Sequence, residues 1–265
     1  MIDTPQKQTE TPETGTRTSS ATRAWWIVGG SITGAFLLFG LTLCAAWIWV
    51  ASSPEQDARH FTEYTQQVDR VDVTVEVGDI KLAAGDAALE VERRTYWRGT
   101  APEISEEWHG SVFNAEGGCE DGYVSWIDLD DCLIHYALAL PSGTDAEAEL
   151  DLGEIELDGL DGEIDVSTGG GDVRGDNLRA GETEVETGVG NVDLAYAEVH
   201  GDITVEVGTG DVTIVVPNDG TTFKVDFDGG VGTPAVDIAT DPSAEADYVI
   251  KVTIGVGDLK VRYAD

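Results

Sequence analysis

Glycine and aspartate recur together at the positions of this chain that are best suited to binding a metal ion. Asp172, Asp211 and Asp258 each follow a Gly-x-Gly triplet, and Asn191 takes the same place in another copy. Stacked Gly/Asp turns bind Ca²⁺ in β-rolls built from nonapeptides, so these aspartates are weak candidate calcium ligands. The alternative is that each side chain accepts hydrogen bonds from the amides of its own turn. The nonapeptide signature is not met, so we favour the turn role and expect no cofactor.

Patterns typical of enzymes are weak in this sequence. The chain has no HExxH, GxSxG or P-loop motif, and its four histidines are scattered: His60, His109, His135 and His200. Acidic pairs are frequent, but chance alone produces them in a chain with 51 Asp and Glu residues. We therefore predict a protein that is not an enzyme and has no catalytic residues. The alternative is a glycan-processing enzyme on a β-helix.

Two cysteines, Cys119 and Cys132, are placed to form a disulfide. In the chain-entropy model, closing a loop of about 14 residues contributes about 3 kcal/mol, and the bond persists only in an oxidising compartment. Two free or metal-binding thiols are the alternative. Neither cysteine belongs to a CxxC motif or stands beside a histidine, so we predict the disulfide.

The elements that must position these residues repeat along the chain. Segments that begin at Gly162, Gly181 and Gly201 align with steps of 19 and 20 residues. A fixed period of this length is typical of stacked β-rungs. The columns that repeat are one of valine and two of glycine: Val166, Val185, Val205; Gly169, Gly188, Gly208; and Gly171, Gly190, Gly210. The pattern predicts an all-β fold, a β-solenoid or β-roll-like stack of two-strand rungs of about 20 residues.

Degenerate copies of the repeat begin near Val71 and Leu150, and the full pattern returns from Ile250, so we expect an extracytoplasmic repeat domain over residues 71–265. An insertion at about 93–135 lacks the repeat and is rich in aromatic residues: Tyr96, Trp97, Trp108, Phe113, Tyr123 and Trp126. We interpret these rings as a cap over one open end of the stack. The alternative is an exposed aromatic face for a glycan or a partner.

The N-terminal part of the chain predicts a membrane anchor. Residues 1–24 read as a disordered cytoplasmic tail, Trp25–Val50 as a transmembrane helix, and 51–70 as a polar stalk. The span has no charge, and its helix of roughly 39 Å exceeds a hydrocarbon layer of about 30 Å. A cleaved signal peptide has a shorter apolar region. Lipidation at Cys44 is a further alternative, but Leu43 is larger than the small residue that a lipidation motif requires.

The charges around this span set its expected orientation. Lys7, Arg17 and Arg23 precede it, whereas the bases that follow are mixed with acids. The positive-inside rule then predicts a single-pass protein of the plasma membrane, with a cytoplasmic N-terminus and most of the chain extracytoplasmic.

The charge of the domain excludes some partners. The net charge is −36, and the first 24 residues contribute none of it. So acidic a domain repels nucleic acid phosphates and anionic headgroups, so we expect no nucleic acid partner. The acidity favours solubility.

The rungs GEIDVSTGGGDV, GDITVEVGTGDVTIVVPNDG and VTIGVGDLKV resemble those of the bacterial DUF4097 proteins, a β-repeat family labelled as adhesins. The segment CLIHYALALPSG (residues 132–143) and the N-terminal anchor are similar to those of membrane-anchored actinobacterial members. The resemblance covers about 70–265 and implies a β-repeat fold without catalytic residues. Together these features predict a membrane-anchored binding, scaffold or envelope-stress module, whose partner is an unknown envelope protein or glycan. A calcium-stabilised surface module is a further alternative.

Overall fold

The computed structural model describes residues 38–44, 55–119, 132–240 and 246–264. The chain divides into two compact units, Met1–Ser53 and Pro54–Asp265. In the first unit the described residues form a helix over 38–44. Among all described residues, no helix is long and apolar enough to cross a membrane. Most of Trp25–Val50 lies outside the described residues, so the anchor remains a prediction.

The second unit is an all-β domain whose described strands join into one continuous sheet. In chain order the strands are β1 (Gln56–Tyr64), β2 (Arg70–Ala84), β3 (Leu89–Trp97), β4 (Glu103–His109), β5 (Val112–Gly118), β6 (Cys132–Leu140), β7 (Asp145–Asp158), β8 (Ile164–Gly170), β9 (Val173–Leu178), β10 (Thr183–Val189), β11 (Val192–Tyr196), β12 (Ile203–Thr209), β13 (Val212–Val216), β14 (Phe223–Val231), β15 (Pro234–Asp237), β16 (Tyr248–Val256) and β17 (Leu259–Tyr263).

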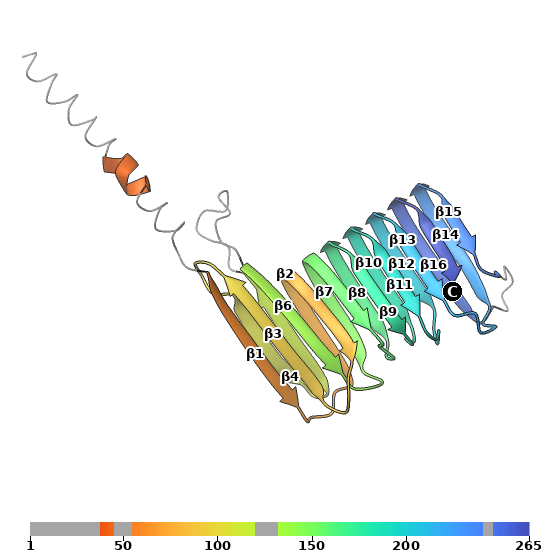
Figure 1. Ribbon diagram of the computed structural model, residues 1–265, viewed down its shortest axis with the longest axis horizontal. Coiled ribbons are helices and arrows are strands. Elements are labelled where there is room, and N and C mark those ends of the chain that lie inside the picture. The colour runs from red at the N-terminus through yellow and green to blue at the C-terminus, as the bar shows by residue number, and fades with distance from the viewer. Residues whose placement is uncertain (1–37, 45–54, 120–131, 241–245, 265) are drawn as a thin grey trace, which may run out of the picture. The chain divides into compact units, whose positions relative to one another are not determined.

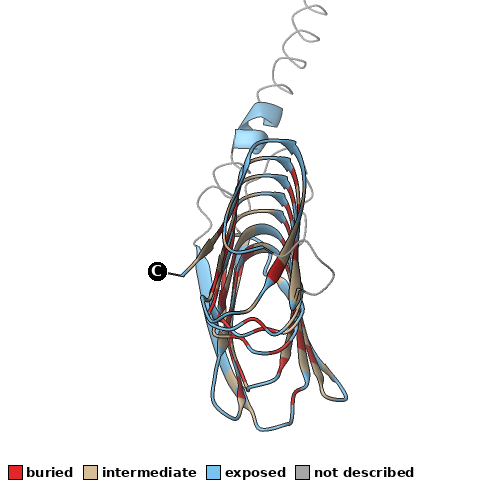
Figure 2. Cartoon of the chain, turned by 90° about the vertical axis from the view of Figure 1, so that its right-hand side faces the viewer, coloured by how far each residue is buried: buried red, intermediate tan, exposed pale blue. Residues whose placement is uncertain are grey.

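From β8 onward each rung is a pair of strands that meet at a Gly-x-Gly corner, such as β8 and β9, whereas β2 and β7 each form a rung as one continuous strand. The first strand of each rung pairs in parallel with the first strand of the next, so that Val166, Val185 and Val205 lie side by side. All three are buried, because alternate residues of a strand face the same side. The predicted two-strand rungs are therefore confirmed, and the repeating valine column faces the core. Figure 2 looks along the stack and shows buried residues between its two sides.

The two sides of the stack form two walls. The β8 wall contains β8, β10, β12, β16 and β14 and continues through the first halves of β7 and β2 into β5 and β4. The β9 wall contains β9, β11, β13, β17 and β15 and continues through the second halves of β7 and β2 into β6, β3 and β1.

The corners require glycine because neighbouring rungs approach closely there. Gly210 has a φ of +152°, and a Cβ atom added to it would lie 1.8 Å from the carbonyl oxygen of Gly190. That distance is less than any ordinary contact, so the space between the rungs excludes every side chain at this position.

The rungs at the C-terminal end do not follow chain order. Strands β16 and β17 pair with β12 and β13 on one side and with β14 and β15 on the other. The rung that is last in the sequence is therefore the second to last in the stack, and β14–β15 is the terminal one (Figure 1). This order was not predicted, because the segment 223–237 departs from the spacing of the full copies.

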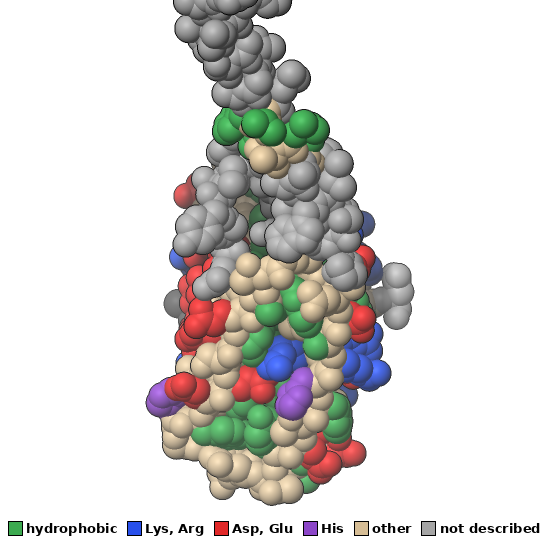
Figure 3. All heavy atoms as spheres, turned by 90° about the vertical axis from the view of Figure 1, so that its left-hand side faces the viewer, with side chains coloured by type: hydrophobic (Ala, Val, Ile, Leu, Met, Phe, Trp, Pro, Cys, Tyr) green, Lys and Arg blue, Asp and Glu red, His purple; other side chains and the backbone are tan. Residues whose placement is uncertain are grey.

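The segment 93–135, which we expected to interrupt the repeat, contributes strands at the other end of the stack. Strand β3 pairs antiparallel with β6, and β4 pairs antiparallel with β5, while β5 and β6 continue the parallel walls. Trp108 and Phe113 lie 5.2 Å apart, between ring centres, and close this end of the core together with Tyr64. For these rings the cap interpretation agrees with the structure. Figure 3 looks onto this end and shows hydrophobic, acidic and basic side chains together.

A buried polar group accompanies the rings at this end. The guanidinium of Arg93 on β3 pairs with the carboxylate of Glu106 on β4, and both side chains are largely buried. The Tyr136 hydroxyl donates to the same carboxylate at 3.3 Å. Burial raises the pKa of Tyr136 to about 12, so this hydroxyl keeps its proton at neutral pH. The contacts join the two walls where the stack ends.

The predicted stalk 51–70 was wrong over Gln56–Tyr64, which is strand β1, paired antiparallel with β3. This strand could not be recognised from the sequence, because its first six residues are all exposed. It therefore lacks the alternation of apolar and polar residues by which half-buried strands are identified.

Candidate functional site

A hollow of about 440 Å³ lies on the outer face of the β9 wall, near the β1 end. The register of four strands explains it. One outward row runs Glu92, Ala137, Lys81 and Glu156 across β3, β6, β2 and β7. Ala137 is the short member of this row of long side chains, so the surface sinks at its position. We call this depression the β9-wall hollow, lined by Asp79, Ile80, Lys81, Glu92, Arg94, Tyr96, His135, Tyr136, Ala137, Glu154 and Glu156.

A second outward row beside the first contains Arg94, His135, Asp79 and Glu154 on the same four strands. His135 Nδ1 lies 2.9 Å from Asp79 Oδ2, and the backbone N–H of Glu154 donates to the other oxygen of Asp79 at 3.1 Å. Arg94 Nε donates to Glu92 at 2.5 Å. The hollow therefore presents acidic and basic side chains in hydrogen-bonded pairs.

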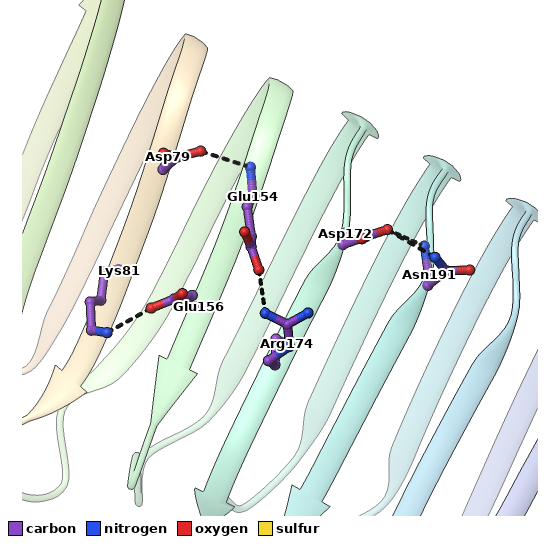
Figure 4. Close-up of polar contacts among 7 residues, drawn as sticks. All are labelled: Asp79, Lys81, Glu154, Glu156, Asp172, Arg174 and Asn191. Atoms are coloured by element: carbon purple, nitrogen blue, oxygen red, sulfur yellow. Dashed lines mark hydrogen bonds and ion pairs between the residues drawn. The ribbon is translucent and has the colours of Figure 1, made fainter.

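Ion pairs also close the side of the hollow toward the repeats (Figure 4). Lys81 Nζ lies 2.6 Å from Glu156, and Arg174 of β9 lies 2.6 Å from Glu154. Each of these side chains has an opposite charge beside it. The site thus offers many hydrogen-bond donors and acceptors without a strong local excess of either charge, in contrast to the acidic domain around it.

An aromatic pair lines the end of the hollow that derives from the predicted insertion. The rings of Tyr96 and His135 meet edge to face, with centroids 5.7 Å apart. Tyr96 belongs to the predicted aromatic cap, and His135 is one of the four scattered histidines of the sequence. Their contact depends on the antiparallel register of β3 with β6, and no local motif signals it.

The pKa shifts in the hollow argue against Glu92 as a general acid. Hydrogen bonds from Arg59 and Arg94 lower the pKa of Glu92. The hydrogen bond to Glu156 and the charge of that residue raise the pKa of Lys81. Both groups are therefore held in their charged forms at neutral pH. A general acid needs a carboxyl whose pKa lies nearer to neutrality.

The candidate calcium ligands stand at the corners of successive rungs and form a ladder. Asp172 accepts a hydrogen bond from the backbone N–H of Asn191 at 2.8 Å, Asn191 accepts one from Asp211 at 3.1 Å, and Asp211 accepts one from Asp258 at 2.8 Å. Each side chain thus accepts its hydrogen bond from the next rung in the stack. The prediction that it bonds to the amides of its own turn was wrong. Among the described residues, no group of three or more His, Cys, Asp or Glu side chains is arranged to hold a metal ion.

The β8 wall carries an acidic outer surface. Asp72, Glu147, Asp165 and Glu184 occupy one outward row of neighbouring strands, and Arg70 pairs with Glu147 at 3.2 Å. Partial burial and the neighbouring acids, above all Glu147, raise the pKa values of Asp72 and Asp165. Burial is the larger cause of these shifts, and repulsion by Glu147 adds to it. These carboxyls lie on the opposite wall from the hollow.

The predicted disulfide between Cys119 and Cys132 is present. It links the residue after β5 to the first residue of β6, so it ties the two walls together near the β1 end. The remaining cysteine, Cys44, is free and exposed. Of the other histidines, His200 contacts Glu198 and His60 contacts Thr62, each within its own segment.

The family of the chain follows from its sequence and agrees with this fold. Residues 115–262, more than half of the chain, match the family described as Toastrack DUF4097. The chain therefore belongs to this family, as the resemblance of its rungs predicted. No curated protein matches the chain.

Two solved structures are similar to this chain at low identity. A "putative cell adhesion protein" from Clostridium sporogenes is 18% identical and aligns with a TM-score of 0.46 over 80% of this chain and 100% of its own. A "putative adhesin" from Bacteroides fragilis is 15% identical, with a TM-score of 0.39 over 77% of this chain and 97% of its own.

Proposed function

We propose that this protein is a non-enzymatic, adhesin-like binding module that takes a saccharide of the cell envelope in the β9-wall hollow. The observation that carries the proposal is the hollow itself, where an aromatic edge adjoins paired acids and bases. Ligand sites combine a concave surface with a few polar groups that fix orientation. A sugar offers hydroxyl groups that both donate and accept hydrogen bonds, and apolar C–H faces that pack on a ring.

The charge pattern favours a neutral ligand. Every acid that lines the hollow has a basic side chain beside it: His135 for Asp79, Arg59 and Arg94 for Glu92, Arg174 for Glu154, and Lys81 for Glu156. A strongly charged ligand would have to displace one of these pairs and would leave its partner uncompensated. A hydroxyl-rich ligand can bond to the outer lone pairs and N–H groups while the ion pairs remain in place.

We further propose that the domain is displayed outside the plasma membrane by the helix predicted over Trp25–Val50. The long uncharged segment supports the anchor, and the disulfide supports an oxidising compartment. A protease added to intact cells should then remove the domain and leave the N-terminal tail with the cells. Protection of the domain from external protease would contradict this placement.

A glycan-processing enzyme is the second candidate, and one observation favours it. His135 and Asp79 form a hydrogen-bonded pair in the hollow, beside the carboxylates of Glu92, Glu154 and Glu156. A histidine oriented by a carboxylate can act as a general base. The lowered pKa of Glu92 argues against it, because a general acid needs a carboxyl whose pKa lies nearer to neutrality. The other acids of the hollow are each paired with a basic side chain.

One experiment separates the two candidates. The protein is applied to an array of envelope saccharides and is then incubated with those it retains. Binding without turnover supports the module, whereas release of cleaved product that is lost in Asp79→Asn supports the enzyme. Tyr96→Ala should weaken binding by about tenfold or more. Thr213→Ala, on the same wall several rungs away, is the matched control and should bind normally. Equal binding by the two variants would place the ligand elsewhere.

A further inference from the structure

Strand β1 is a long free edge of the β9 wall. Its nine residues pair with β3 alone among the described strands, so the backbone groups on its other side lack a partner in the sheet. Its first six residues are exposed, and Phe61 keeps 57% of its surface exposed to solvent. Such an edge is a template for one more strand.

The strands at the opposite end of the stack are poorly suited to pairing with an additional strand. Its terminal strand β15 has only four residues and begins with Pro234, which cannot donate a hydrogen bond. The other terminal strand, β14, contains Gly229 and Gly230. Short edges, proline and glycine all disfavour the addition of a strand, and β1 has none of these features.

The sequence of β1 is complementary to itself when two copies run antiparallel. With Phe61 placed opposite Phe61 of a second copy, Arg59 of each chain faces Glu63 of the other. Residues 59, 61 and 63 share the outer face, since Phe61 is paired with Glu92 and Arg59 bonds to that same glutamate. The register therefore joins two aromatic rings on the symmetry axis and places an ion pair on each side. Within the described residues Glu63 has no ion-pair partner of its own.

Neighbouring registers are less favourable. A shift to His60 on the axis would place Asp57 opposite Glu63 twice, and like charges directly opposite one another destabilise a sheet. A shift to Thr62 would bring neither Arg59–Glu63 pair together. If one strand slipped by a single residue against the other, outward-facing residues of one copy would lie opposite inward-facing residues of the other. Of the registers centred on His60, Phe61 and Thr62, only the Phe61-centred one places unlike charges opposite each other. A register centred on Ala58 would pair Asp57 with Arg59, but it would overlap only residues 56–60 of the strand.

We propose that β1 is a dimer interface, in which two copies of this chain join their β9 walls through antiparallel β1 strands centred on Phe61. The interface is isologous and closes after two copies. The two hollows would then lie on one continuous surface, which would let a single polymer engage both. The proposal of the interface stands without the proposed function, because no ligand contributes to it.

Cross-linking of the full-length chain in mild detergent tests the register. All variants carry Cys44→Ser, which removes the exposed free thiol. Phe61→Cys should form a disulfide-linked dimer on mild oxidation, because the two sulfurs meet on the axis. Arg59→Cys alone should not, since residue 59 and its copy are offset by four residues, about 13 Å along the strands, and a disulfide needs Cα atoms within about 7 Å. A mixture of Arg59→Cys and Glu63→Cys should cross-link.

Charge reversal supplies an independent test that does not depend on cysteine variants. The mass of the wild-type chain, measured by light scattering at rising concentration, should approach that of a dimer. Arg59→Glu should weaken the dimer by about tenfold or more, and Arg59→Glu with Glu63→Arg should restore it. A wild-type chain that stays monomeric overturns the proposal. So does a dimer that Arg59→Glu leaves intact, or a self-link of Arg59→Cys without one of Phe61→Cys.

Discussion

Replacement of Gly210 by alanine tests how closely the rungs are stacked at their corners. A Cβ atom there would lie 1.8 Å from the Gly190 carbonyl oxygen, whereas real Cβ atoms essentially never come within 3.0 Å of such an atom. The rungs must therefore separate locally by about 1.2 Å. Gly210 also has a φ of +152°, a conformation that side chains disfavour.

The expected cost follows from the contacts that this separation breaks. The N–H of Gly190 donates to the carbonyl of Thr209 at 3.0 Å, and the N–H of Val192 donates to the carbonyl of Asp211 at 2.9 Å, both between the two rungs that must separate. A shift of this size takes such bonds out of hydrogen-bond range. Two lost bonds cost about 2 kcal/mol, and the backbone strain adds about 1–2 kcal/mol. We expect Gly210→Ala to lose about 3–4 kcal/mol and about 10 °C of Tm.

Thermal and urea unfolding followed by circular dichroism measure this loss. Gly181→Ala is the control, because the nearest atom to its added Cβ is the Glu163 Cγ at 3.9 Å. That variant should match or slightly exceed the wild type in stability, since alanine restricts the unfolded chain. A loss below about 1 kcal/mol for Gly210→Ala, or an equal loss for both variants, would refute the close-stacking argument.

Three further predictions concern single side chains. Asp165→Asn should stabilise the domain at pH 7, because the raised pKa of Asp165 in the folded state means that folding penalises its charged form. Urea unfolding at several pH values should show this gain disappear at about pH 3, where the aspartate is protonated in both the folded and the unfolded state. Thr187→Val should gain about 1 kcal/mol in the same assay, because the Thr187 hydroxyl is buried without a hydrogen-bond partner and valine keeps its shape; a loss would indicate a hidden partner. Asp211→Asn should be nearly silent, whereas Asp211→Ala should lose about 1 kcal/mol, since it removes the acceptor for Asp258. Ca²⁺ should raise the Tm no more than Mg²⁺ does, and a gain specific to Ca²⁺ that Asp211→Asn abolishes would restore the calcium hypothesis.

The repeat made most of the rung architecture predictable. Three copies in register, with Val166, Val185 and Val205 in one column, identify strands whose alternate residues face a common core. The glycine columns identify the corners. The sequence could not show that the corner aspartates bond to the next rung, because the distance between rungs depends on the stacked structure and not on the turn alone.

Features that depend on pairing between distant segments were not predictable. The first six residues of β1 are exposed on both faces and include several charges, so the composition of this strand is that of a polar stalk. Strands β16 and β17 come between two rungs that precede them in the chain, and no local signal sets that order. The hollow likewise depends on Ala137 lying between Glu92 and Lys81, which are 45 and 56 residues away from it in the sequence.

The same limit applies to chemistry. His135 is one of four scattered histidines in the sequence, and Asp79 is one of many acids. Only the parallel register of β2 with β6 brings them together, so their pairing had to come from the structure.

The most direct test of the central claim is to locate a bound saccharide by nuclear magnetic resonance. A saccharide retained on the array is titrated into the labelled protein while the backbone amide resonances are followed. We expect saturable shifts of the backbone amide resonances of Tyr96, His135 and Ala137, with little change on the β8 wall. Shifts confined to the β8 wall or the Gly-x-Gly corners, or no saturable shift with any envelope saccharide, would contradict it.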